Sequence, residues 1–141
     1  MKRKGSAKWS GDLKTGKGLV STESGALADR PYGFNTRFGD EKGTNPEELI
    51  GAAHASCFSM ALSSELGKAG ITAESIETTS TVEVKPGEGG FTIPAVHLSV
   101  TITAPGADKA AVGKAAADAK AGCPVSKLLK AEITMDAIVN V

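Results

Sequence analysis

The sequence has little of the chemistry on which most metal proteins and disulfide frameworks depend. Its 141 residues include only two cysteines, Cys57 and Cys123, 66 positions apart, and two histidines, His54 and His97. A secreted disulfide framework normally carries more cysteines, and neither cysteine belongs to a CxxC pair or to a zinc-ligand spacing. In a reducing compartment, such a pair is more often redox-active, catalytic or merely buried.

Long apolar runs and an excess of one charge are also missing. The 16 basic and 16 acidic residues cancel, and the only basic cluster, residues 2–4, is expected to be a solvated tail, so nucleic acid is a poor candidate partner. No stretch approaches membrane-spanning length, and no apolar segment follows the charged start as in a secretory signal. We therefore expect a cytoplasmic protein with no membrane partner, folded as a single domain over residues 1–141.

The order of the expected elements indicates an α+β domain. Short β-prone runs come first, a long helix follows, and strands and helices then mix without regular βαβ alternation. His97 falls on the polar face of its strand and is expected at the surface. The expected strands are residues 8–10, 18–22, 33–38, 76–85, 95–103 and 133–139, and the expected helices are residues 46–68, 108–121 and 123–130.

The helix over residues 46–68 has the clearest signals. Asn45 suits the N-cap, Pro46 suits the first helical position, and Glu48 completes a pattern like a capping box. Gly70 is a plausible C-cap residue. The first two-thirds of the helix are apolar or small on nearly every side, which predicts a helix that is buried all round.

The two cysteines are the candidate nucleophiles, but the residues alone do not rank them. Cys57 lies within the buried helix, where burial raises a thiol pKa, whereas Cys123 precedes a short helix whose free N–H groups lower it. Cys57 could equally be a small core residue, and Cys123 an ordinary cap residue. To react, Cys57 needs a cationic partner, either His54, three positions earlier on the same helix face, or an arginine. Arg37, between two aromatic residues on a predicted strand, is the best-placed arginine, although a solvated strand charge is the simpler interpretation.

Three segments together resemble the OsmC branch of the OsmC/Ohr hydroperoxide reductases. Residues 43–62 (GTNPEELIGAAHASCFSMAL) are similar to the central-helix motif of that family, and residues 119–126 (AKAGCPVS) to its second-cysteine motif. Residues 32–38 (YGFNTRF) resemble the stretch that carries its active-site arginine. The resemblance covers essentially the whole chain, and its two cysteine motifs at the right separation make it specific.

The resemblance implies a role for each matching residue. Cys57 matches the peroxidatic cysteine, Cys123 the resolving cysteine, Arg37 the arginine that activates the thiolate, and Glu47 the glutamate that holds the arginine. His54 matches a feature of the OsmC branch with no assigned role.

The resemblance also implies a fold and a function. The fold is an intertwined homodimer in which a long central helix packs on a curved antiparallel sheet. The function is reduction of organic hydroperoxides in oxidative and osmotic stress defence, with a small dithiol or lipoyl-type reductant and with no metal, haem, flavin or other cofactor.

Helix geometry suggests that the active site is shared between two chains. Glu47 and Cys57 lie ten positions apart on one helix, which separates them by roughly 15 Å and about 80° around the axis. A second, antiparallel copy would bring Glu47 of one chain near Cys57 of the other.

Two rival functions remain open. One is a hydrolase that uses Cys57 with His54 as its base. The other is a non-catalytic binder of an apolar ligand.

Overall fold

The computed structural model describes all of residues 1–141, and the chain divides into two compact units, Met1–Leu49 and Ile50–Val141. The expected single domain over residues 1–141 stays a prediction. None of the helices has the length and apolar character needed to cross a membrane.

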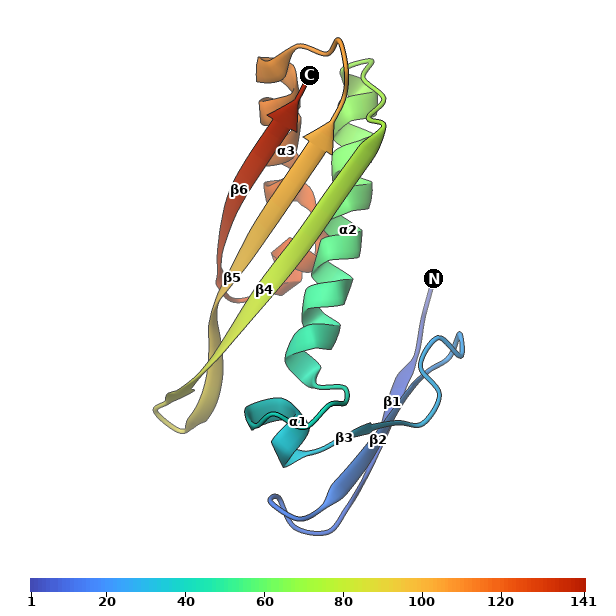
Figure 1. Cartoon of the computed structure of the whole chain (residues 1–141), viewed down its shortest axis with the longest axis vertical. Helices are drawn as coiled ribbons and strands as arrows, with labels where there is room; N and C mark the ends of the chain where they lie inside the picture. The colour runs from blue at the N-terminus through green and yellow to red at the C-terminus, as the bar shows by residue number, and fades with distance from the viewer. The chain divides into compact units, whose positions relative to one another are not determined.

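The first unit is built on a small antiparallel sheet. β2 lies between β1 and β3 and pairs with both, as Figure 1 shows. The predicted strands over residues 8–10 and 18–22 are confirmed, and β3 was not predicted. The elements of this unit are β1 (Gly5–Ser10), β2 (Lys17–Thr22), β3 (Arg30–Tyr32) and α1 (Phe34–Phe38), and the first residues of α2 (Pro46–Lys68) follow.

The predicted strand over residues 33–38 is wrong, because α1 occupies most of this segment. The Thr36 hydroxyl accepts a hydrogen bond from the Gly33 N–H at 2.8 Å and donates to a nearby carbonyl oxygen, which closes the backbone into a turn. Phe34 and Phe38 then lie one helical turn apart, with ring centroids separated by 5.1 Å. Residues at positions i and i+4 share a face in both a strand and a helix, so the spacing of these aromatics could not distinguish the two.

The long helix α2 begins and ends where the sequence predicts. The Asn45 side chain caps it by accepting the Glu48 N–H at 2.8 Å. At the other end Gly70 adopts a positive φ of 71°, and the Ile71 N–H bonds to the Leu66 carbonyl, the arrangement of a Schellman cap. Gly51 sits inside the helix because a Cβ there would lie 2.8 Å from the carbonyl oxygen of Ser80 on β4.

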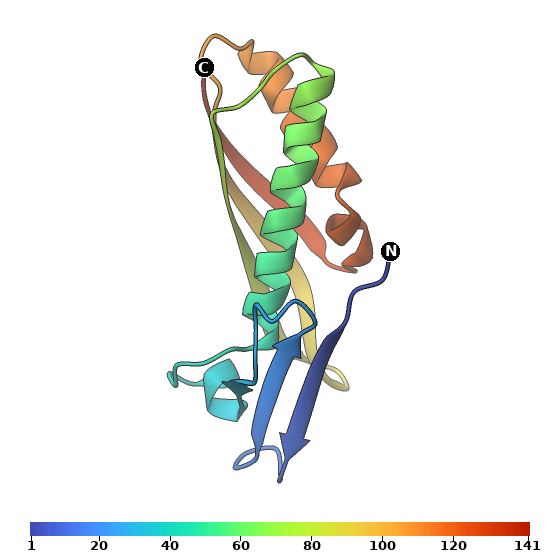
Figure 2. The same cartoon turned by 90° about the vertical axis from the view of Figure 1, so that its right-hand side faces the viewer.

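The second unit packs helices on one face of a three-stranded sheet of order β4-β5-β6. Figures 1 and 2 show α2 and α3 side by side on that face. The implied antiparallel sheet is only partly correct, because β6 runs parallel to β5. A parallel neighbour requires a long crossover, and the two helices α3 and α4 supply it. The elements are β4 (Ser75–Gly87), β5 (Gly90–Thr103), α3 (Lys109–Gly122), α4 (Pro124–Leu128) and β6 (Glu132–Asn140).

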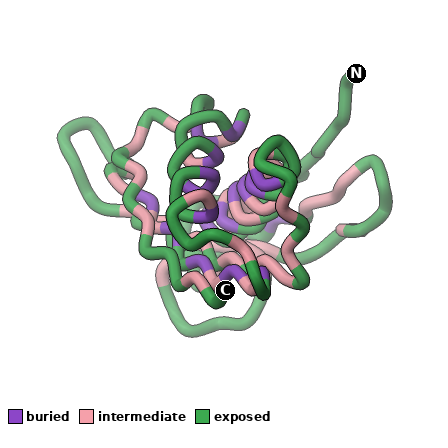
Figure 3. Tube along the Cα trace, turned by 90° about the horizontal axis from the view of Figure 1, so that it is seen from above, coloured by how far each residue is buried: buried purple, intermediate pink, exposed green.

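The core of the second unit lies between this sheet and its helices. Val96, Leu98, Val100 and Ile102 alternate along β5, and each of them is 2% exposed or less. In α2, only one side is buried this deeply, which corrects the expectation of burial all round; Met60 on the other side is 76% exposed. Figure 3 shows the buried residues gathered where the elements face one another. The main core residues are Phe58, Leu62, Leu66, Leu98, Val100, Ile102, Val112, Ala116, Ala119 and Cys123.

Candidate active site

The fold of the second unit brings the two cysteines together although they are far apart in sequence. Cys57 lies in the middle of α2, and Cys123 lies at the junction where α3 ends and α4 begins. Both are free thiols, and they lie close enough for each to shift the pKa of the other. Cys57 is partly exposed and Cys123 is 0% exposed, so a reagent from solvent reaches the sulfur of Cys57 more readily.

The surroundings of the two thiols shift their pKa values in opposite directions, as the sequence suggested. Burial raises the pKa of Cys57, and the hydrogen bond with Cys123 adds to this effect. No cationic side chain contributes to this shift in the pKa of Cys57. Burial alone would raise the pKa of Cys123, but hydrogen bonds from the Cys57 thiol, from Ser126 and from the Val125 N–H outweigh it and lower that pKa. Within this pair the buried thiol is therefore the more acidic one.

His54 lies on α2, three residues before Cys57, and is fully buried. Its Nε2 is 2.8 Å from the hydroxyl of Ser126 on α4, and its Nδ1 is 3.2 Å from the hydroxyl of Ser80 on β4. Burial lowers the pKa of His54, which favours the neutral ring. Because both ring nitrogens are taken by hydroxyl groups, His54 is not placed to serve as a base for Cys57, as a hydrolase would require.

Arg37 and Glu47 form an ion pair within the first unit. The guanidinium approaches the carboxylate with two nitrogens: Nη2 is 2.7 Å from Oε1, and Nε is 3.0 Å from the same oxygen. The Glu47 side chain is 10% exposed and that of Arg37 34% exposed. The guanidinium carbon also lies 5.0 Å from the centre of the Phe38 ring, which favours the charge further. The pair holds a cation in a defined orientation at the start of α2.

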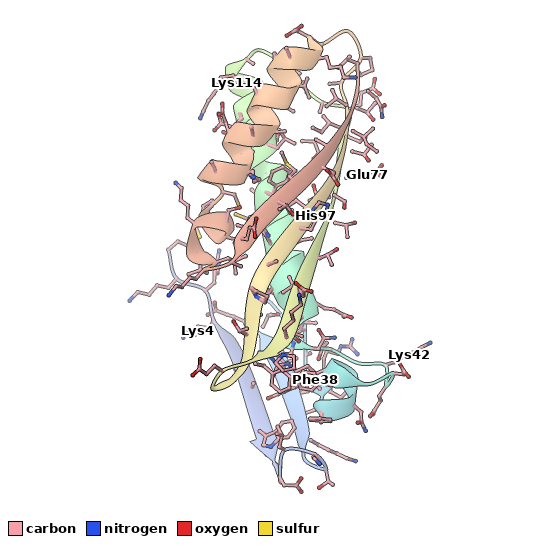
Figure 4. The ribbon with its side chains drawn as sticks, turned by 90° about the vertical axis from the view of Figure 1, so that its left-hand side faces the viewer. Lys4, Phe38, Lys42, Glu77, His97 and Lys114 are labelled. Atoms are coloured by element: carbon pink, nitrogen blue, oxygen red, sulfur yellow. The ribbon has the colours of Figure 1, made fainter.

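An apolar pocket of about 310 Å³ adjoins the guanidinium in the first unit. Aromatic side chains from β1, β3 and α1 make up much of its wall, and Phe38 is visible on α1 in Figure 4. A hydrocarbon group could be buried here with a polar end toward Arg37. The lining residues are Trp9, Leu13, Tyr32, Gly33, Phe34, Arg37, Phe38 and Pro46.

Some of the predicted positions pair as expected, and others lie elsewhere. Arg37 meets Glu47, and Cys57 meets Cys123, but the roles of all four residues stay predictions. His97 lies on the face of the sheet that the helices leave open, as expected, 2.7 Å from the Thr134 hydroxyl (Figure 4).

The sequence did not predict the pocket wall or the serine partners of His54, which lie 26 and 72 positions from it along the chain. The only sequence signal for these partners was the position of Ser126, three residues after Cys123. Nowhere do three or more His, Cys, Asp or Glu side chains converge as metal ligands would.

Comparison with known families settles the relationship. The family model described as "OsmC-like protein" matches residues 39–137, a segment that includes Glu47, Cys57 and Cys123. The chain belongs to this family. Arg37 falls just before the matched segment.

Close relatives of this OsmC-like chain extend the match to almost its full length. It is 59% identical over 134 residues to "Peroxiredoxin OsmC" of Escherichia coli, which covers 95% of this chain and 94% of that protein, and it matches the Shigella flexneri protein of the same name equally well. A crystal structure of an organic hydroperoxide resistance protein OsmC from Legionella pneumophila is 27% identical, with a TM-score of 0.70 over 98% of this chain and 97% of that one. The organic hydroperoxide resistance protein OhrB of Bacillus subtilis, at 24% identity and a TM-score of 0.72 over 96% and 97%, shares the fold.

Proposed function

We propose that this OsmC-like chain is a cytoplasmic thiol peroxidase that reduces organic hydroperoxides in defence against oxidative and osmotic stress. The observation that carries the proposal is the cysteine pair, in which one partly exposed thiol lies beside one buried thiol. A peroxidase of this kind needs an accessible sulfur to meet the peroxide and a second sulfur within reach to trap the product. The relatives named peroxiredoxin and organic hydroperoxide resistance protein support the same chemistry.

In the proposed reaction, the Cys57 thiolate attacks the distal oxygen of the hydroperoxide. The O–O bond breaks, the alkoxide leaves and is protonated to the alcohol, and Cys57 becomes a sulfenic acid. Cys123 then attacks the sulfenic sulfur, and a disulfide and water are formed. An external dithiol, of small or lipoyl type, reopens the disulfide by thiol–disulfide exchange. No cofactor takes part in this cycle.

The proposed cation for Cys57 is Arg37 of a partner subunit in a homodimer. Because burial raises the pKa of Cys57, a positive charge close to its sulfur would favour the thiolate. The ion pair with Glu47 lies inside one chain, so whichever subunit supplies Glu47 to a site also supplies Arg37. Since Glu47 and Cys57 lie ten residues apart on one helix, we propose that each site combines the cysteine pair of one chain with the Arg37–Glu47 pair of the other.

The apolar pocket beside Arg37 supports an organic rather than an inorganic peroxide as substrate. Its aromatic wall would bury the hydrocarbon tail while the guanidinium meets the developing negative charge on oxygen. Apolar residues of α2 near Cys57 in the sequence do not supply such a wall, because Phe58 packs into the core and Met60 is exposed. The pocket of the first unit takes their place in the proposal.

A comparison of two serine variants tests the proposal. Cys57→Ser should abolish consumption of an alkyl hydroperoxide, because no accessible nucleophile remains. Cys123→Ser should keep the first oxidation and let Cys57 stall as a sulfenic acid or oxidise further, which mass spectrometry after one equivalent of peroxide detects.

Activity retained in Cys57→Ser, with a sulfenic acid on Cys123, would reverse the two roles. A wild-type protein that consumes no peroxide with any dithiol would refute the function itself.

A further inference from the structure

Buried hydrogen bonds link His54 to two serine hydroxyl groups, and one of these serines, Ser126, lies close to the second cysteine. Ser126 lies three residues after Cys123 in α4, where its backbone N–H and its hydroxyl both act to lower the pKa of the Cys123 thiol, and the same hydroxyl lies 2.8 Å from Nε2 of His54. Ser80 occupies the other ring nitrogen at 3.2 Å. These residues come from α2, α4 and β4, three elements that meet inside the second unit.

The number of available protons determines which groups donate and which accept in these hydrogen bonds. A serine hydroxyl has one proton, so Ser126 can donate either to the Cys123 sulfur or to His54, but not to both. When Nε2 of His54 carries the ring proton, it donates to the Ser126 oxygen, and the hydroxyl proton is free to point at the sulfur. Nδ1 is then an acceptor for the Ser80 hydroxyl. In the other tautomer, Nε2 accepts the proton of Ser126, and Cys123 loses that hydrogen bond.

We infer that His54 is a positioning residue that turns the Ser126 hydroxyl toward Cys123 and so promotes closure of the Cys57–Cys123 disulfide. The inference rests on the proposed peroxidase function. In the step concerned, the Cys123 thiolate attacks the sulfenic sulfur of Cys57, the S–S bond forms and the S–O bond breaks. Cys123 is oxidised, the sulfenic sulfur is reduced, and the departing hydroxide takes up the proton that Cys123 lost, giving water. A hydroxyl proton aimed at Cys123 stabilises the thiolate that makes this attack.

The surroundings of His54 suit this task. A neutral ring can donate from one nitrogen and accept at the other, whereas a protonated ring donates from both. Burial keeps the ring neutral by lowering its pKa, and no charged group of α2, β4 or α4 contributes to that shift. His54 acts through Ser126, because neither of its ring nitrogens hydrogen-bonds to either cysteine.

Amide variants distinguish positioning from simple filling of space. The amide N–H of His54→Gln reaches about as far as Nε2 and should still donate to Ser126, whereas the shorter amide of His54→Asn should not. We expect His54→Asn and Ser126→Ala to slow disulfide formation about tenfold, the effect of one hydrogen bond to a charged group. His54→Gln should stay close to wild type. The matched control is His97→Gln, on the open face of the sheet, which should change nothing.

Two measurements are needed. Rapid-quench mass spectrometry with one equivalent of alkyl hydroperoxide gives separate rates for sulfenic acid and disulfide formation, and only the second should fall. Alkylation of Cys123 by iodoacetamide against pH, in the Cys57→Ser background, should move its midpoint to higher pH in His54→Asn and Ser126→Ala. Thermal melting confirms that each variant is folded, and Ser126→Ala serves if His54→Asn is not.

The inference is overturned if disulfide formation and the alkylation profile are unchanged in Ser126→Ala, or if both oxidation steps slow equally. It is also overturned if His54→Gln behaves like His54→Asn. Because the alkylation profile needs no peroxide, it still tests the role of His54 if the protein proves not to be a peroxidase.

Discussion

Two inactive variants of this protein should regain activity when their subunits are mixed. In the proposed dimer, Cys57→Ser removes the nucleophile from its own site, whereas Glu47→Ala damages the site of the partner. A mixed dimer then holds one site with both defects and one intact site. When equal amounts exchange at random, about half of the dimers are mixed and half of their sites are intact, so activity should return to about one quarter of the wild-type value.

The Arg37–Glu47 ion pair makes the test more specific. Both residues come from one chain and lie 2.7 Å apart, so they should always enter the same site together. Arg37→Ala mixed with Cys57→Ser should therefore recover the same quarter. Arg37→Ala mixed with Glu47→Ala should recover nothing, because every site of that mixed dimer lacks one member of the pair.

The structure also sets the expected sizes of the single defects. Hydrogen bonds to charged groups contribute about 1.5–3 kcal/mol each, so loss of Arg37 should slow the peroxide step by roughly 10- to 150-fold. The cost in folding stability should be smaller, about 1 kcal/mol, because Arg37 is 34% exposed and solvent screens the pair. Arg37→Ala and Glu47→Ala should therefore both stay folded and remain able to exchange subunits.

The assay is consumption of an alkyl hydroperoxide, first by the exchanged mixture and then by heterodimers that are purified with two different affinity tags and verified by native mass spectrometry. Purified heterodimers should show about half of the wild-type activity, because half of their sites are intact. Inactive Cys57→Ser/Glu47→Ala heterodimers would refute the shared site, as would an active monomer at assay concentration. Recovery of activity in the Arg37→Ala/Glu47→Ala heterodimer would show that the two residues of the pair serve different sites.

Three further predictions follow from the pocket, the core and the buried histidine. Alkyl hydroperoxides should have a higher kcat/KM than hydrogen peroxide, since each buried methylene contributes about 0.8 kcal/mol. Phe34→Ala in the pocket wall should lower the ratio of the two kcat/KM values. An unchanged ratio would mean that the hydrocarbon tail binds elsewhere. Leu98→Ala should lower the free energy of unfolding by about 2–5 kcal/mol in urea titrations. Thr79→Ala, at an exposed position of β4, should have little effect on it. Because burial lowers the pKa of His54, the unfolded chain binds its proton at a higher pH than the folded chain, so stability should fall as pH drops below about 6.5. His54→Gln should flatten that part of the stability profile, and an equal slope in both proteins would contradict the shift.

The elements that the sequence predicted correctly are those with strong local signals. Asn45 and Gly70 mark both ends of α2 with caps, and nothing between them breaks the helix. The apolar residues of β5 alternate over the length of the strand, and their inward side chains are buried as this period requires. In such segments, local preference and tertiary packing favour the same structure.

The errors arose where distant contacts or short side-chain bonds decide the conformation. Thr36 turns a strand-like alternation into the helix α1 through hydrogen bonds that no hydrophobic period reveals. The parallel pairing of β6 depends on how its crossover packs, and the partners of His54 come from other elements. The ion pair of Arg37 with Glu47 was expected only from the family resemblance, because nine intervening residues, most of them in a loop, do not fix a side-chain contact.

The order of acidity in the cysteine pair explains what the proposed arginine must accomplish. Without a cation, a charge is favoured on Cys123 over Cys57, because burial raises the pKa of Cys57 whereas Ser126 and Val125 lower that of Cys123. A guanidinium brought to Cys57 would reverse this order and create the nucleophile only when the site is complete. Once Cys57 is a sulfenic acid, the preference of the backbone and hydroxyl donors for a charged Cys123 works in the forward direction. The same hydrogen bonds that hold back the first oxidation would then speed closure of the disulfide, which protects Cys57 from further oxidation.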